Sequence, residues 1–193
     1  MSEKSNNGLP GPCILNPMSM RKLIFMLALM AAVPTGAQNT KAPLDGQNRQ
    51  FFDDLLDHLP GPWKMTGQIL GQPVTHRVAA EWALNHQFLH FHEKDTADPP
   101  AYEVDVYIGY DNMSERYVAH WLDVFGGRYS ETLGFGKRDG NSIRFLFEYP
   151  DGPFVNTFVW KPELRKWQFV LESKNSDGKW TKFAILDMSP AGK

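Results

Sequence analysis

Residues 142–160 read SIRFLFEYPDGPFVNTFVW, and this stretch decides the fold class. Apolar and polar side chains alternate on both sides of Pro150-Asp151-Gly152-Pro153, which is the pattern of two β-strands that each bury one face. The four central residues favour a tight turn, because glycine and aspartate tolerate turn backbone angles and proline cannot donate to a strand ladder. The stretch therefore predicts an antiparallel β-hairpin.

The same pattern repeats along the chain at intervals of about ten residues. It predicts ten strands, at 62–70, 74–84, 86–94, 102–109, 116–123, 128–136, 142–149, 153–160, 166–173 and 180–187. Connections this short join antiparallel neighbours, and an open sheet would leave two unpaired edges. We therefore expect an all-β, ten-stranded, antiparallel up-and-down barrel. Apolar side chains at helical spacing over 48–58 predict one short helix before it, closed by Pro60-Gly61.

Placing each turn at its centre predicts which side chains meet on the apolar face of the sheet. The predicted contacts are Trp82 with Leu89, Phe91 with Val104, Val104 with Trp121, Val106 with Ala119, Phe145 with Phe158, Phe158 with Phe169, and Trp160 with Trp167. The other face then holds the charged side chains Arg77, Glu81, Glu103, Asp105, Arg144, Glu148, Lys166 and Glu172. One face is thus apolar throughout and the other faces water. Only strand 128–136 departs from the pattern, since it puts Leu133 and Phe135 on the polar face, and we expect a β-bulge there.

Composition excludes several classes of protein. The chain has 193 residues, a formal charge of −2 and 42% hydrophobic residues, which suits one globular domain. A near-neutral charge argues against nucleic-acid binding, and an aromatic content of 13% argues against disorder. Glycine-rich phosphate loops and nucleophile motifs are absent from the sequence, so we expect no cofactor.

The first 37 residues have the three parts of a secretory signal. Met20-Arg21-Lys22 is a basic start, residues 23–33 are uninterruptedly apolar, and small residues follow up to Ala37. We expect cleavage after Ala37 and a secreted or periplasmic protein without a stable membrane anchor; an uncleaved N-terminal anchor is the competing interpretation. Residues 1–19 are interpreted as an over-extended start, 38–47 as a flexible lead-in, and 48–190 as the single barrel domain.

Three short motifs resemble a known family. Gly61-Pro62-Trp63 is similar to the Gly-x-Trp opening of lipocalin-like barrels. Residues 108–111 (IGYD), 117–123 (YVAHWLD) and 177–183 (DGKWTKF) resemble motifs of a bacterial family catalogued as domain of unknown function 1579. The resemblance spans residues 50–187 and implies an exported lipocalin-like barrel without an established reaction. Nitrobindin-like haem barrels are a more distant resemblance, but they place the iron-binding histidine late in the chain, and no histidine follows His120 here.

The aromatic inner face has two interpretations. Small barrels fill themselves with side chains, whereas barrels of ten strands often enclose a ligand. We favour a small apolar ligand in a cavity lined by Trp82, Phe91, Val104, Trp121, Phe145, Asn156, Phe158, Trp160 and Phe169. A hydrolase or isomerase acting at the barrel mouth, and a structural or interaction barrel with a solid core, are the alternatives.

Asn156 is the polar residue within this inner face. The turn geometry places it between Phe147 and Leu171, where its amide needs a partner from the backbone, a water molecule or a ligand.

A group of polar side chains is expected on the outer face. Centring the loops sets His90 opposite Asp105, His92 opposite Glu103, and Asp105 opposite His120. Imidazoles and a carboxylate in this arrangement are possible zinc ligands. The alternative is a hydrogen-bonded ladder on a solvated face. Because the aromatic face lies on the other side of the sheet, we favour the ladder and predict no metal site.

Overall fold

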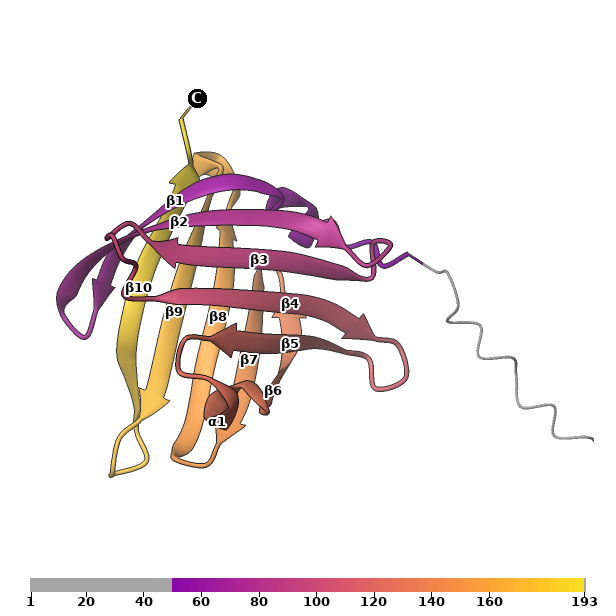
Figure 1. Cartoon of the computed structure of the whole chain (residues 1–193). Helices are drawn as coiled ribbons and strands as arrows, with labels where there is room; N and C mark the ends of the chain where they lie inside the picture. Colours follow the sequence, from indigo (N-terminus) through magenta and orange to yellow (C-terminus); the bar gives the residue numbers. More distant parts are fainter. Residues whose placement is uncertain (1–49, 193) are drawn as a thin grey trace, which may run out of the picture. The chain divides into compact units, whose positions relative to one another are not determined.

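The computed structural model describes residues 50–192, so the predicted signal and lead-in segments lie outside the described residues. Within that range ten strands follow one another around a closed barrel in which every neighbouring pair is antiparallel and β1 meets β10 (Figure 1). The strands are β1 (Gly61–Ile69), β2 (Gln72–Ala83), β3 (Phe88–Asp95), β4 (Glu103–Asp111), β5 (Arg116–Asp123), β6 (Leu133–Asp139), β7 (Ser142–Tyr149), β8 (Gly152–Lys161), β9 (Lys166–Lys174) and β10 (Trp180–Pro190). The predicted all-β, ten-stranded barrel is confirmed.

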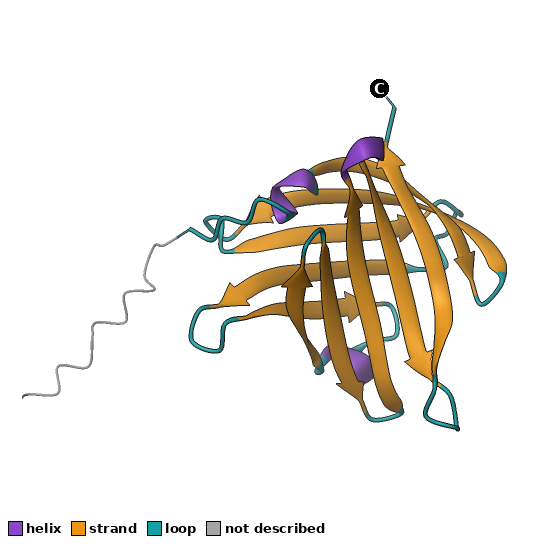
Figure 2. Ribbon diagram, turned by 180° about the vertical axis from the view of Figure 1, so that it is seen from behind, coloured by secondary structure: helices purple, strands orange, loops and turns teal. Residues whose placement is uncertain are grey.

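The core lies between two walls of this barrel. Figures 1 and 2 show β2–β5 running across the direction of β7–β10. Side chains from both walls interleave, as when Phe91 of β3 meets Phe158 of β8 edge to face with their centroids 5.8 Å apart. No helix of the described residues is long and apolar enough to cross a membrane.

The strand register confirms some of the predicted contacts and corrects others. Confirmed pairs are Trp82 with Leu89, Phe158 with Phe169, and Trp160 with Trp167. The rest are wrong by two residues, since the observed pairs are Phe91 with Val106, Val106 with Trp121, Ile108 with Ala119, and Phe145 with Asn156.

These shifts arise because the turns are centred one residue away from their predicted positions; the β7–β8 turn, for example, is Pro150-Asp151, since Tyr149 pairs with Gly152. The β3–β4 loop is closed by the Asp95 amide, which donates to the Tyr102 carbonyl at 2.9 Å, and this bond moves the centre of the loop by one residue. A shift of two residues in register keeps every side chain on its own face, so the predicted inner side chains still point inward.

The sixth strand differs most from its prediction. Residues Gly127–Ser130 form the short helix α1, and β6 starts only at Leu133. No register shift interrupts the β5–β6 pairing, so the predicted bulge is wrong. Leu133 and Phe135 simply face outward, while the inward positions are Gly134 and Gly136.

The predicted helix 48–58 is also wrong over the described residues, where only the 3-10 turn η1 (Leu56–His58) forms. Barrel side chains satisfy the carbonyl groups that a longer helix would have used. Trp63 Nε1–H donates to Leu59 O (2.7 Å) and Trp167 Nε1–H donates to His58 O (3.2 Å). Residues 51–59, here called the plug, instead bury Leu55, Leu56 and Leu59 at one end of the barrel.

Candidate functional site

The two ends of the barrel differ in chemistry. The plug covers the end where β1 begins and β2 ends. The opposite end, here called the α1 end, is where α1 joins β5 to β6 and where β1 leads into β2. Its inner positions follow from the alternation along each strand and include the polar residues His76, Glu93, Asp123 and Asn156. The prediction of an inner face that is apolar throughout is therefore wrong at this end.

His76 and Glu93 form a buried pair. His76 of β2 is 3% exposed and Glu93 of β3 is 2% exposed, and His76 Nδ1 is hydrogen-bonded to a Glu93 carboxylate oxygen. Such a bond fixes the orientation of the imidazole and leaves its Nε2 for another partner. Tyr102 packs beside the pair, with its ring centroid 6.0 Å from that of His76.

A second group of polar and aromatic side chains surrounds Asp123 at the end of β5. Trp121 Nε1–H donates to the Tyr102 hydroxyl at 3.1 Å, and one Asp123 carboxylate oxygen accepts the Phe125 amide at 3.0 Å. Burial raises the pKa of Asp123 above the usual range of a carboxyl group. Burial also raises the pKa of Tyr102 and Tyr149, an effect to which nearby carboxylates add, so both phenols stay neutral at ordinary pH.

Asn156 lies at an inner position of β8, in the opposite wall. It is 3% exposed, and its Oδ1 has no hydrogen-bond partner. Its cross-strand neighbours are Phe145 and Leu171, so the predicted neighbour Leu171 is confirmed and Phe147 is replaced by Phe145. The ring centroid of Trp121 lies 6.2 Å from that of Phe147 and 5.9 Å from that of Phe169. These two phenylalanines belong to β7 and β9, the strands on either side of β8, which carries Asn156.

The other predicted cavity residues fall into two layers. In the middle of the barrel, aromatic rings contact one another and leave the centre filled with side chains. The centroid of Phe158 lies 4.5 Å from Phe169, 5.8 Å from Phe91 and 6.0 Å from Phe145. Val104 is buried at the α1 side of this layer, opposite Glu93 and Asp123.

The remaining two predicted cavity residues, Trp82 and Trp160, lie at the plug end. Trp82 Nε1–H donates to Asp57 of the plug at 3.0 Å, and Trp160 stacks on His58 with centroids 4.6 Å apart. Trp160 also lines a surface groove of about 560 Å³, together with His58 and Arg165. The structure thus spreads the predicted set over the α1 end, the middle layer and the plug end.

Three residues of the α1 end were missed by the sequence analysis: His76, Glu93 and Asp123. A usable signal was present. Glu93 continues the alternation of Leu89 and Phe91, and Asp123 continues that of Ala119 and Trp121. His76 lies two residues before the buried Val78, so the same alternation places it on the inner face.

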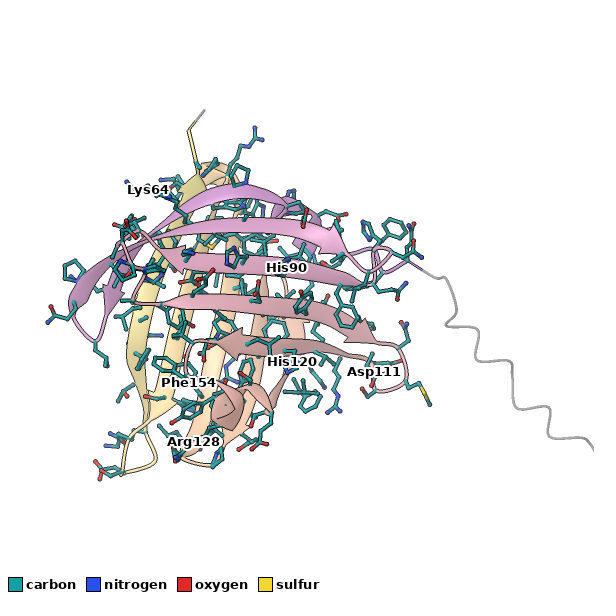
Figure 3. The ribbon with its side chains drawn as sticks, in the orientation of Figure 1. Lys64, His90, Asp111, His120, Arg128 and Phe154 are labelled. Carbon is teal, nitrogen blue, oxygen red and sulfur yellow. The ribbon has the colours of Figure 1, made fainter. Side chains whose placement is uncertain are left out.

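The predicted outer-face group forms only in part. His90 Nε2 lies 2.6 Å from Asp105 Oδ1, and His92 Nε2 lies 2.9 Å from Glu103 Oε1. His120 does not join them, because its Nε2 is hydrogen-bonded to the Ser130 carbonyl of α1 at 2.6 Å. Figure 3 shows His90 on β3 and His120 on β5, with β4 between them. No group of three metal-ligating side chains meets among the described residues.

Comparisons with known proteins give distant likenesses among solved structures alone. No protein-family description and no curated protein matches the sequence. Among solved structures, the crystal structure of Rv2717c from M. tuberculosis is similar over 74% of this chain and 100% of its own, with a TM-score of 0.44 and 11% sequence identity. The resemblance to the family with domain of unknown function 1579 therefore stays a prediction.

Proposed function

We propose that this barrel is an exported protein that binds one small, mainly apolar organic molecule at its α1 end. The observation that carries the proposal is Asn156, a buried amide whose oxygen has no partner, on an aromatic wall. Leaving a buried acceptor unpaired costs about 1–3 kcal/mol, and a bound ligand that donates a hydrogen bond removes this cost.

The apolar part of the ligand would contact the aromatic side chains of the same end. Tyr149, Phe154 and Phe183 are only partly buried, and Phe154 lies 5.2 Å from Phe183 and 6.4 Å from Tyr149 between ring centroids. Partly buried aromatic rings beside a few polar groups are typical of small-molecule sites. Residues of the plug are buried at the other end and aromatic rings pack in the middle, and both observations support a ligand site at the α1 end.

Export rests on the N-terminal sequence alone. The basic start at Met20 to Lys22, the apolar run and the small residues before Gln38 favour a cleaved signal. N-terminal sequencing of the protein made by its own host tests this: a start at Gln38 supports export, and a start at Met20 or earlier contradicts it.

Native mass spectrometry of the protein purified from its own host tests ligand binding. We expect a retained small-molecule mass that denaturation releases. Replacing Asn156 by leucine should lower the occupancy at least about tenfold without loss of stability, because one buried hydrogen bond is removed and an apolar group fills the site. Thr157→Val on the outer side of the same strand is the matched control and should retain the ligand. Ligand-free protein from the host, together with no binding of the neutral fluorescent probe N-phenyl-1-naphthylamine, would favour a solid structural barrel.

The His76–Glu93 pair favours a second candidate, an enzyme that moves a proton at the α1 end. A carboxylate that orients an imidazole is the arrangement of a general base, and Asp123 with its raised pKa could return the proton. A purified substrate-like ligand that is recovered unchanged after incubation favours binding, whereas a chemically altered product that His76→Gln abolishes favours the enzyme.

A further inference from the structure

Charge is divided unevenly along the described part of the chain. Residues 50–115, which hold the plug and β1–β4, include three lysine or arginine residues and 11 aspartate or glutamate residues. Residues 116–192, which hold β5–β10, include 11 lysine or arginine residues and nine aspartate or glutamate residues. The half with β5–β10 is therefore slightly positive, whereas the other half is strongly negative.

Three cations of the positive half form a row on the outer face of the barrel. Lys137 of β6 and Arg144 of β7 are direct cross-strand partners. The strands β5 and β6 pair Tyr117 with Gly136. One step further along this antiparallel register, Arg116 lies beside Lys137. Lys137 and Arg144 are exposed, and Arg116 alternates with the buried Tyr117, so all three side chains point away from the core.

Aromatic rings lie among these cations. The guanidinium carbon of Arg116 is 3.7 Å from the ring centroid of Phe135. The guanidinium carbon of Arg144 and the ammonium nitrogen of Lys174 are 5.5 Å and 5.2 Å from the ring centroid of Trp180. Phe135 is 37% exposed and Trp180 is 38% exposed, so both rings also reach water. The part of the outer face with these side chains is here called the basic face, and its cations are Arg116, Lys137, Arg144 and Lys174.

The cations of the basic face lack carboxylate partners. None of the four forms an ion pair among the described residues. Glu172, on the outer face of β9, is bonded to Lys182 instead, at 2.8 Å. Arg116 attracts Asp111 from beyond ion-pair distance, and its buried Nε–H has no hydrogen-bond partner. Cations without partners beside exposed aromatic rings are available to an anionic surface.

We infer that the basic face docks reversibly on an anionic lipid bilayer. Lysine and arginine side chains are attracted to anionic headgroups, and tryptophan and phenylalanine side chains favour the interface between headgroups and acyl chains. The basic face combines both kinds of side chain. It also extends over neighbouring strands, of which β7–β10 lie side by side in one wall (Figure 1), so several headgroups could be contacted at once. This inference does not depend on the ligand proposed at the α1 end.

Co-sedimentation with lipid vesicles tests the inference. The two probes are vesicles of phosphatidylcholine alone and vesicles that also contain about one third phosphatidylglycerol. We expect the protein to bind the anionic vesicles at least about tenfold more tightly than the neutral ones. High salt should abolish this difference, because dissolved ions screen the attraction.

Two double variants separate the basic face from net charge. Replacing Lys137 and Arg144 by glutamine should weaken binding to the anionic vesicles at least about tenfold, since each cation near such a surface contributes about fivefold. Lys64 and Arg77 are also direct cross-strand partners, on the outer face of β1 and β2, and Figure 3 shows Lys64 on β1. Replacing this pair by glutamine removes the same charge from the negative half and should change binding less than about twofold.

A third variant tests the aromatic part of the basic face. Trp180→Ala should weaken binding to the anionic vesicles at least about threefold, because the exposed part of the ring no longer enters the interface. Unfolding in urea checks that each variant is folded before its vesicle binding is measured.

Equal binding to both kinds of vesicle, equal losses in the two double variants, or an unchanged affinity of Trp180→Ala would each overturn the inference. Retention on poly-L-glutamate that depends on Lys137 and Arg144, without vesicle binding, would overturn it in favour of an acidic protein partner. Binding of N-phenyl-1-naphthylamine without vesicles tests the ligand site separately, so either proposal can fail while the other stands.

Discussion

The ring of Phe147 occupies the space that a side chain at Gly134 would need. A Cβ built on Gly134 would lie 2.4 Å from Cζ of Phe147, and one built on Gly136 would lie 2.8 Å from Cδ1 of Phe145. Both phenylalanine side chains are completely buried, so their rings have no free space to move into. The two glycines of β6 therefore admit two rings of β7 to the core.

Gly134→Ala should destabilise the barrel by about 1–3 kcal/mol, the usual cost of adding volume to a packed core. Urea denaturation measures the change. In a Phe147→Leu background the same substitution should cost less, because the smaller side chain leaves room for the methyl group. Gly127→Ala is the control, since a Cβ there meets nothing within 4 Å, and it should change stability by less than about 0.5 kcal/mol. An unchanged midpoint for Gly134→Ala would contradict this account of β6.

The plug should loosen when Tyr117 loses its hydroxyl. Asp53 is buried; one of its oxygens accepts the amides of Leu55 (3.0 Å) and Leu56 (2.8 Å), and the other accepts the hydroxyl of Tyr117. Tyr117→Phe removes that last donor and should cost about 1–2 kcal/mol in thermal or urea unfolding.

Tyr107→Phe is the control for this prediction, because Tyr107 lies on the outer face with its ring stacked on His90. It should change stability by less than about 0.5 kcal/mol. Equal effects of the two substitutions would show that the plug does not depend on the bond from Tyr117.

Asp123→Asn should stabilise the protein at neutral pH. Burial raises the pKa of Asp123 in the folded state above its unfolded value near 3.8. The folded state therefore holds this proton more tightly, and the contribution of Asp123 to stability falls as the pH rises from 3.8 through the raised pKa. The asparagine variant escapes this loss, so its gain should appear at pH 7 and vanish at about pH 3. Unfolding curves at both values measure it, and a destabilised variant at pH 7 would show that the ionised carboxylate supports the fold.

We predict that the protein has no zinc site to which both His90 and His120 contribute. His90 is paired with Asp105, whereas His120 is turned toward the Ser130 carbonyl. Calorimetric titration of zinc into the wild type, His90→Ala and His120→Ala proteins tests this. A one-to-one site at micromolar concentration, lost in both variants, would mean that the two histidines rearrange to share the ion.

The hydrogen bond between His92 and Glu103 offers a related pH test. This bond and a nearby lysine lower the pKa of Glu103 below its usual value. A lowered folded-state pKa contributes stability above the unfolded pKa, and that stability disappears as the pH falls through the lowered value. His92→Ala should remove part of this acid dependence, which NMR titration of the Glu103 side chain measures directly. Because Glu103 is solvent-exposed, we expect little effect on stability at pH 7.

Sequence alone determined the strands, the closure of the barrel and the inward direction of most core side chains. Alternation along one strand is a local property, and a register error of two residues preserves it, as the pairing of Phe91 with Val106 instead of Val104 shows. The turns were recognisable for the same reason, since their residue types act within a few positions of the chain.

Only the tertiary structure decided how distant segments share space. Residues 51–59 have the apolar spacing of a helix. They form the plug instead, and indole N–H groups from β1, β2 and β9 donate hydrogen bonds to it. Position 134 must lack a side chain because the Phe147 ring fills that space. The sequence of β6 by itself does not show this. Likewise, His76, Glu93, Asp123 and Asn156 come from β2, β3, β5 and β8. The contact between His76 and Glu93 depends on the pairing of β2 with β3, because side chains interact through their distance in space and the sequence alone gives only their order along the backbone.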